Sequence, residues 1–159
     1  MTRRFEIIEK LKVNFIIQEL VDKHTYDKYG DDAWQFFDTD ALHCLLIFRR
    51  GIGKYFQVNT WHNGGIYSQR GLRTNISKIV KKKTKKNKLY LSGHVLGKAF
   101  DFVVIGMKAD DVRKWAVENA DLFPCKIRLE KTANGVVLTW LHFDCKQIES
   151  NPKVYLFNA

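Results

Sequence analysis

Apolar residues recur with helical spacing in the first third of the chain. Residues 16–21 (IIQELV) have the pattern of a short amphipathic helix, and the aromatic-rich segment 26–37 is typical of a helix or turn packed on a core. A longer helix is predicted over residues 41–50, because its leucines fall on one helical face, and Thr39 or Asp40 can cap its start. The first part of the chain is therefore expected to be helical.

The patterns after this helix favour strands. Residues 55–60 and 99–105 each predict one strand, because apolar and β-branched residues dominate them. Segments 126–130 and 136–145 are the arms of a predicted hairpin around the dipeptide Asn134-Gly135, which is favoured in tight turns.

One further helix is expected over residues 109–119, between the strand at 99–105 and the hairpin. The sequence contains no internal repeat and no linker-like segment. Helices followed by strands, one helix and a terminal hairpin predict an α+β fold. We expect one domain over residues 1–159, with a small antiparallel sheet and flanking helices.

Composition is ordinary for a globular protein, but the charge is not balanced. The chain has 159 residues, of which 45% are hydrophobic and 28% charged, so a packed core is expected rather than disorder. Lys and Arg outnumber Asp and Glu by 27 to 17, for a net charge of +10. This excess favours an anionic partner such as nucleic acid, acidic lipid or a bacterial wall. The lysine-rich run 81–88 is interpreted as a solvated loop.

The cysteines and the N-terminus indicate where the chain is made. Cys44, Cys125 and Cys145 form no C-x-x-C pair, and we interpret them as reduced core residues; zinc binding by Cys145 is the alternative. The N-terminus lacks the apolar stretch of a signal peptide, and no window approaches the ~18 apolar residues of a membrane span. We expect synthesis in the cytoplasm and no membrane span.

The strongest candidate chemistry involves two histidines and an aspartate. His94 lies seven positions before Asp101, a spacing that fits a loop leading into a strand. In the last predicted strand, alternation places Trp140, His142 and Asp144 on one face. Catalytic zinc usually takes three ligands from His, Asp, Glu or Cys, so His94, Asp101 and His142 are candidates. The plain alternative for His142 is a buried histidine with a satisfied hydrogen bond.

These residues also carry a family resemblance. Residues 92–101 (SGHVLGKAFD) match S-x-H-x-x-G-x-A-x-D, and residues 140–142 (WLH) match W-x-H. In these motifs the chain resembles the zinc DD-peptidases of the M15 family. That family includes D-alanyl-D-alanine carboxypeptidases and phage endolysins that cut between L-alanine and D-glutamate. The resemblance spans residues 59–145 and implies the Hedgehog/DD-peptidase fold, with Zn²⁺ held by His94, Asp101 and His142.

The resemblance also suggests residues that contact substrate. Residues 71–75 align with a G-Y-R-S segment whose arginine holds the substrate or the oxyanion, which implies this role for Arg73, with Arg70 as second choice. An arginine suits either partner because its guanidinium donates two hydrogen bonds at once. A solvent-facing loop arginine is the plain alternative. Ser92 is either a donor to substrate or a structural turn serine.

The general base departs from the family pattern. Many relatives have Glu or Asp three positions before the last histidine, where this chain has Thr139. Asp144 is one substitute, either as the base or as an acceptor that orients a ligand histidine. Glu130 is the other, since some relatives carry a glutamate in a comparable place. A three-residue hairpin loop would put Glu130 opposite Leu138, so Glu130 reaches His142 only with a bulge or another register.

We therefore expect a zinc metallopeptidase that hydrolyses a peptide bond in the peptidoglycan stem peptide. It would act on the cell wall, as a phage or prophage lysin, and its positive charge would favour anionic wall polymers. The first alternative is an inactive zinc-binding module of the same fold that binds the wall or a partner. A nucleic-acid-binding domain is disfavoured, because it would leave His94, Asp101 and His142 unexplained.

Overall fold

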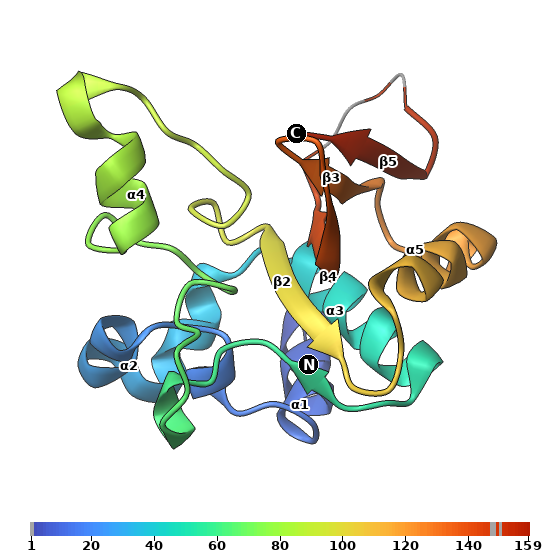
Figure 1. The fold of residues 1–159 in the computed structure, drawn as a ribbon. Helices are drawn as coiled ribbons and strands as arrows, with labels where there is room; N and C mark the ends of the chain where they lie inside the picture. Colours follow the sequence, from blue (N-terminus) through green and yellow to red (C-terminus); the bar gives the residue numbers. More distant parts are fainter. Residues whose placement is uncertain (1, 147–148, 150) are drawn as a thin grey trace.

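The computed structural model describes residues 2–146, 149 and 151–159, which form a single α+β domain (Figure 1). The helices are α1 (Arg3–Lys12), α2 (Lys23–Tyr29), α3 (Thr39–Ile52), α4 (Lys78–Lys83) and α5 (Ala109–Glu118). The strands are β1 (Phe56–Gln57), β2 (Ala99–Val104), β3 (Ile127–Ala133), β4 (Val136–Asp144) and β5 (Val154–Asn158). Short 3₁₀ turns connect several of these elements.

The strands form one mixed sheet in the order β1-β2-β4-β3-β5. β5 pairs with β3 in parallel, while the other neighbours are antiparallel. The expectation of a purely antiparallel sheet is therefore wrong, and β5 was not expected. Alternation of apolar residues predicts that a segment is extended, but it does not fix the direction in which the segment pairs.

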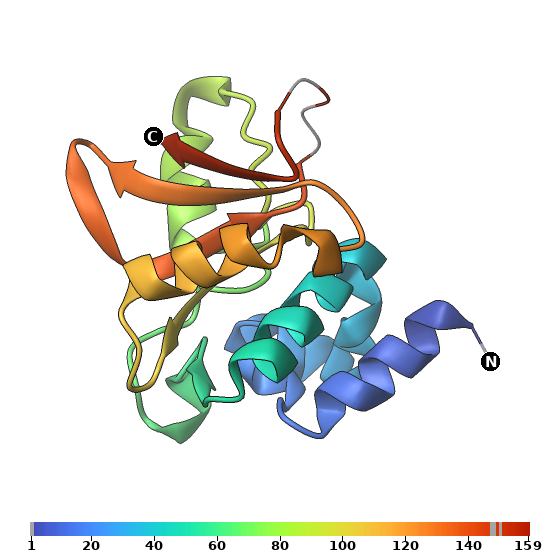
Figure 2. The ribbon, with the colours of Figure 1, turned by 90° about the vertical axis from the view of Figure 1, so that its right-hand side faces the viewer.

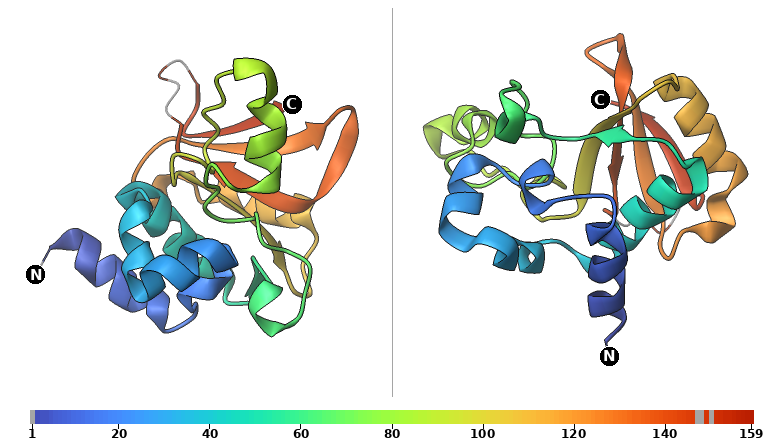
Figure 3. Two further views of the ribbon diagram at one scale, coloured as in Figure 1. Left: turned by 90° about the vertical axis from the view of Figure 1, so that its left-hand side faces the viewer. Right: turned by 90° about the horizontal axis from the view of Figure 1, so that it is seen from below.

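The two faces of the sheet differ in character. Phe48 of α3 packs against Phe102 and Phe143, with ring centroids 5.8 and 5.2 Å apart, so one face is the core. α5 covers this face as well, while α4 stands on the opposite side of the sheet (Figures 2 and 3). Because side chains alternate along a strand, residues next to Phe102 and Phe143 face away from the core. That outer face is where the polar candidates lie.

The helices predicted at 41–50 and 109–119 are confirmed, with differences at the ends. Asp38 caps α3, because its carboxylate accepts from the backbone N–H groups of Asp40 and Ala41; capping by Thr39 or Asp40 is wrong. The expected helix at 16–21 is only a 3₁₀ turn, Ile17–Glu19.

Three other segments differ from the expectation. Only Phe56–Gln57 of the strand predicted at 55–60 joins the sheet. The lysine run is exposed as predicted, but it is partly helical as α4 rather than a loop. α1 was not expected; only Ile7 and Leu11 of this helix are buried. No helix of the described residues is long and apolar enough to cross a membrane.

The β3–β4 hairpin decides the geometry of the outer face. Asn134 and Gly135 both have positive φ, so the turn has two residues and pairs Ala133 with Val136. The expected three-residue loop is therefore wrong. A bulge follows, because Thr132 pairs with Val137 whereas Glu130 pairs with His142. Glu130 thus lies directly across from His142 instead of opposite Leu138.

Arg113 of α5 stabilises this bulge. It is 3% exposed, and its guanidinium donates to the backbone carbonyls of Glu130, Leu138 and Trp140 at 3.0–3.1 Å. Bulged residues lose partners in the strand ladder, and buried carbonyls without a donor are costly. Arg113 supplies those donors and so holds β3 and β4 in the register that places Glu130 beside His142.

Candidate metal centre and adjoining cleft

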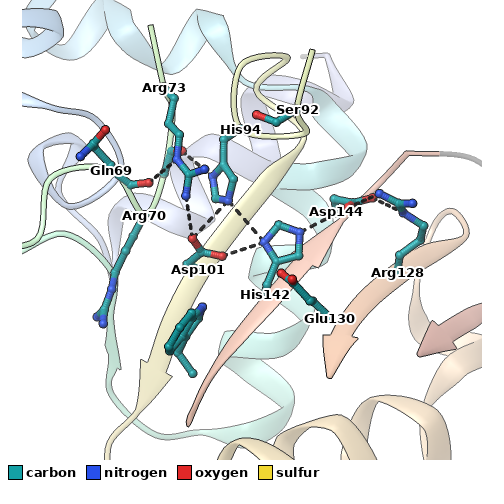
Figure 4. Close-up of polar contacts among 12 residues, drawn as sticks. Gln69, Arg70, Arg73, Ser92, His94, Asp101, Arg128, Glu130, His142 and Asp144 are labelled. Carbon is teal, nitrogen blue, oxygen red and sulfur yellow. Dashed lines mark hydrogen bonds and ion pairs between the residues drawn. The ribbon is translucent and has the colours of Figure 1, made fainter. Parts of the chain in front are cut away.

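Two rows of polar residues cross the outer face of the sheet. In the first row Asp101 of β2 pairs with His142 of β4, which pairs with Glu130 of β3. In the second row, Asp144 lies two residues beyond His142 and pairs with Arg128 of β3. Alternation keeps both rows on one face, and Figure 4 shows their side chains gathered there.

His94 comes from the turn that precedes β2 and is 2% exposed. Its Nδ1 lies 2.8 Å from the backbone oxygen of Gly71, which can only accept, so Nδ1 carries the proton. Its Nε2 then holds a lone pair and points toward His142 and Asp101 (Figure 4). Gly71 itself packs against Leu20, since a Cβ there would meet the Leu20 carbonyl oxygen at 1.9 Å.

His142 is held from both sides by carboxylates. Its Nε2 donates to Asp144 Oδ2 at 3.3 Å, and its Nδ1 lies 2.7 Å from Asp101 Oδ1. Burial lowers the pKa of His142, but hydrogen bonds to Asp101 and Asp144 outweigh this and raise it to about 9. Burial likewise opposes ionisation of Asp101, yet His94 and His142 hold its pKa well below the usual range.

The triad of His94, Asp101 and His142 is suited to holding a metal ion. One ligand atom from each lies within 4.8 Å of the other two. The outer nitrogen of each imidazole is engaged, by Gly71 for His94 and by Asp144 for His142. Such partners fix the orientation of each ring. The inner nitrogen of His94 holds a lone pair, whereas that of His142 faces the Asp101 carboxylate and would release its proton on binding a metal. Two imidazoles and one carboxylate are a donor set that zinc takes at catalytic sites. The structure thus brings together the three residues that the sequence singled out.

Asp144 is fixed by its neighbours. Arg128 donates two hydrogen bonds to its carboxylate, at 2.9 and 2.7 Å, and the backbone N–H of Lys146 donates a third. Burial opposes its ionisation, but His142 and Arg128 lower the pKa of Asp144 to about 2. With its oxygens engaged in this way, Asp144 is suited to orienting His142 rather than to collecting a proton.

Glu130 has the opposite surroundings. It is half-buried beside His142, and within the described part of the chain its carboxylate accepts no hydrogen bond (Figure 4). Burial raises the pKa of Glu130, although the nearby His142 opposes the rise. A carboxyl group with a raised pKa and unengaged oxygens is suited to proton transfer.

The two candidate arginines lie in different environments. Arg73 donates to Asp101 Oδ2 at 3.0 Å and to the Gln69 carbonyl at 2.7 Å, so it contacts a candidate metal ligand. Arg70 stacks on Tyr67, with 3.4 Å between guanidinium carbon and ring centroid. Its buried Nη1 has no hydrogen-bond partner among the described residues. Ser92 accepts a 3.3 Å hydrogen bond from the Val95 N–H within the turn that carries His94.

A cleft of about 470 Å³ adjoins the triad. Its walls come from the loop before α4, from α4 itself and from the outer face of β2 and β4. The residues that line it include Tyr67, Arg70, Arg73, Asp101, Thr139 and Trp140. The cleft reaches Asp101 directly, so a bound molecule there would lie against the triad.

Sequence reasoning missed Arg113 and Arg128. The signal for Arg128 was its spacing of two from Glu130, which predicts a shared strand face, but its pairing with Asp144 depends on the bulge. Arg113 gave no signal, because it acts only on backbone carbonyls that the bulge exposes.

Comparisons with known protein families, with curated proteins and with solved structures found no match for this chain.

Proposed function

We propose that this chain is a zinc-dependent peptidase that hydrolyses a peptide bond in the stem peptide of peptidoglycan. The observation that carries the proposal is the convergence of His94, Asp101 and His142 beside a cleft, with both outer imidazole nitrogens engaged. The substrate class is supported by the resemblance of residues 92–101 and 140–142 to the M15 motifs. The Hedgehog/DD-peptidase fold and a phage or prophage origin belong to the same proposal.

The inner nitrogens of His94 and His142 and the carboxylate of Asp101 would hold the zinc ion. When bound, zinc supplies a Lewis acid that polarises a carbonyl and lowers the pKa of water to about 7. The remaining residues keep these ligands in place. Asp144 and the Gly71 carbonyl fix the two rings, and Arg73 orients Asp101.

Proton transfer falls to Glu130. Its carboxylate accepts a proton from the attacking water and delivers it to the nitrogen of the leaving amine. The bulge held by Arg113 puts Glu130 in the same row as His142 and Asp101, which compensates for Thr139. Asp144 is not the base in this scheme, because Arg128 engages both of its oxygens.

Substrate binding falls to the cleft. Stem peptides carry carboxylates, and Arg70, which lines the cleft, would supply a guanidinium to bind one. Arg73 is the weaker candidate for this contact, since its guanidinium already binds Asp101. Tyr67 and Trp140 provide flat walls, and the lysines of α4 would favour retention on an anionic wall.

Digestion of purified peptidoglycan tests the proposal. We expect the zinc-loaded protein to release new fragments, and mass spectrometry of their ends identifies the bond that was cut. Asp101→Ala and chelator treatment should each abolish release, whereas Glu118→Gln, an exposed glutamate on α5, should not. One zinc ion per chain without any cleavage would contradict the peptidase proposal. That result would favour the inactive wall-binding module, the alternative suggested by Thr139 in place of an acidic residue.

A further inference from the structure

Three cysteines from distant segments meet in the core. Cys44 lies in α3, Cys125 precedes β3, and Cys145 follows the last residue of β4. The sulfur of Cys44 is 3.9 Å from that of Cys125 and 3.8 Å from that of Cys145. All three sulfurs lie within 4.8 Å of one another, and all three side chains are buried. The expectation of core cysteines is confirmed, but their convergence was not foreseen.

The spacing of the sulfurs suits a shared metal ion. A Zn–S bond of about 2.3 Å places two sulfurs about 3.8 Å apart at a tetrahedral ion and about 4.0 Å apart at a trigonal one. The observed separations fall at these values, so an ion requires little movement of the side chains. A disulfide would require an S–S distance of about 2.05 Å and would leave the third thiol unpaired.

The surroundings favour a thiolate at one of the three positions, Cys125, whereas burial raises the pKa of Cys44 and the hydrogen bond with Cys125 raises that of Cys145. Hydrogen bonds from Cys145 and Cys44 lower the pKa of Cys125, and the charges of Lys153 and His43 act in the same direction. Three thiolates around a divalent ion carry one net negative charge, which Lys153 helps to offset. His43 contributes less, because burial and the charge of Arg3 lower its pKa. His43 itself is turned toward Arg3, with 3.1 Å between its Nδ1 and Arg3 Nη2.

We propose that Cys44, Cys125 and Cys145 form a second metal site, which takes a thiophilic ion of the Zn²⁺ and Cu⁺ class. Thiolate sulfur is the ligand that such ions prefer. Among the described residues, no fourth His, Cys, Asp or Glu offers an atom to this group. The ion is therefore three-coordinate or completed by a water molecule.

The role of this site is structural. It joins α3 to the segments that precede β3 and follow β4, and none of its cysteines lines the cleft beside the triad. Cys145 directly follows Asp144, which orients His142, so the site anchors the end of the strand that carries the proposed active site. The inference stands independently of the proposed peptidase.

The test uses the full chain with the triad disabled by Asp101→Ala and His142→Ala. Metal-free protein is titrated with Co²⁺, as a spectroscopic probe for zinc, and with Cu⁺ in separate arms. We expect one ion per chain in at least one arm and a thiolate-to-cobalt charge-transfer band in the cobalt arm. We also expect a rise in Tm of about 10 °C at a free ion concentration about 1,000 times Kd. Preference for Zn²⁺ or Cu⁺ then follows from competition between the two ions.

Cys145→Ser in the same background should abolish the thiolate band and the shift in Tm. If that variant does not fold, the titration of the parent protein decides alone. The proposal is overturned if the cobalt arm shows no thiolate band and Tm is unchanged in both metal arms. Reductant-free purified protein whose mass is lower by two hydrogens also overturns it, because a disulfide would then occupy two of the three sulfurs.

Discussion

The end of β4 lies between two clusters of potential metal ligands that differ in almost every respect. On the outer face, His142 joins His94 and Asp101 in a set of nitrogen and oxygen donors beside a cleft. On the core side, Cys145 joins Cys44 and Cys125 in a set of sulfur donors away from that cleft. Catalytic zinc sites keep a position open to substrate, and of the two clusters it is the triad that adjoins the cleft. The accessibility of each cluster therefore indicates its role more directly than its residue types do.

The two clusters also differ in how much support they need. Each histidine of the triad is oriented by an outer partner, and Asp101 is held by Arg73. Among the described residues, no hydrogen-bonding side chain of this kind orients the three sulfurs. Packing in the hydrophobic core positions them. A catalytic metal site needs ligands in a fixed orientation, while a buried structural metal site needs only the correct distances between its ligand atoms. Variants of the outer-face residues should therefore mainly change activity, and variants of the cysteines should mainly change stability.

The largest effect is expected at Glu130. Glu130→Gln keeps the shape of the side chain but removes its ability to accept a proton, so kcat should fall by ~10²–10⁴-fold. Zinc content and Tm should stay unchanged, because Glu130 is not a ligand and its carboxylate accepts no hydrogen bond from the described residues. Steady-state kinetics on a soluble stem peptide, with Glu118→Gln as control, measures this. Equal rates for both variants would remove Glu130 from the mechanism.

A substitution of Arg113 should lower both stability and kcat, whereas Glu130→Gln should lower kcat alone. Arg113→Met leaves three carbonyls of the bulge without their donor, which should lower the free energy of unfolding by about 3 kcal/mol or more. The folded fraction should also have a reduced kcat, because Glu130 loses its register with His142. Urea unfolding and kinetics are compared with Lys114→Met on the exposed side of α5. A variant that is destabilised yet fully active would show that the bulge does not position the base.

Asp144 should affect metal affinity on the outer face alone. Asp144→Asn weakens the partner that fixes the His142 ring, so the zinc affinity of the triad should fall by ~10–100-fold. Competition with a metal-binding dye measures this, and the exposed Asp121→Asn is the control. Unchanged affinity would mean that the hydrogen bond to Asp144 does not prepare His142 for zinc.

The smallest effect on activity is expected from the cysteines. Cys145→Ser should lower Tm in zinc-containing buffer but leave the kcat of the folded protein within about threefold of the parent, since no cysteine lines the cleft. Thermal unfolding and kinetics on the same sample give both values. A loss of kcat as large as that of Glu130→Gln would contradict the division between a catalytic and a structural cluster.

Much of the fold was predictable because local patterns determine it. The spacing of apolar residues gave α3, α5 and β2, and Asn134-Gly135 gave the position of the hairpin turn. The direction of β5 was not predictable, because it depends on where the chain returns to the sheet. Nor was the register of Glu130, which depends on carbonyl contacts from Arg113 on a separate helix.

The two clusters show the same limit of prediction. The triad could be proposed because residues 92–101 and 140–142 have a recognisable spacing. The cysteine cluster could not, since Cys44 lies 81 residues before Cys125 and 101 residues before Cys145. Only the folded core brings those sulfurs together.

The most direct test of the central claim is a crystal structure of the zinc-loaded protein with anomalous diffraction recorded on both sides of the zinc absorption edge. The account predicts a strong anomalous peak bonded to His94 Nε2, His142 Nδ1 and a carboxylate oxygen of Asp101, with an open position toward the cleft. Zinc-saturated crystals with no anomalous peak among these three residues would contradict it.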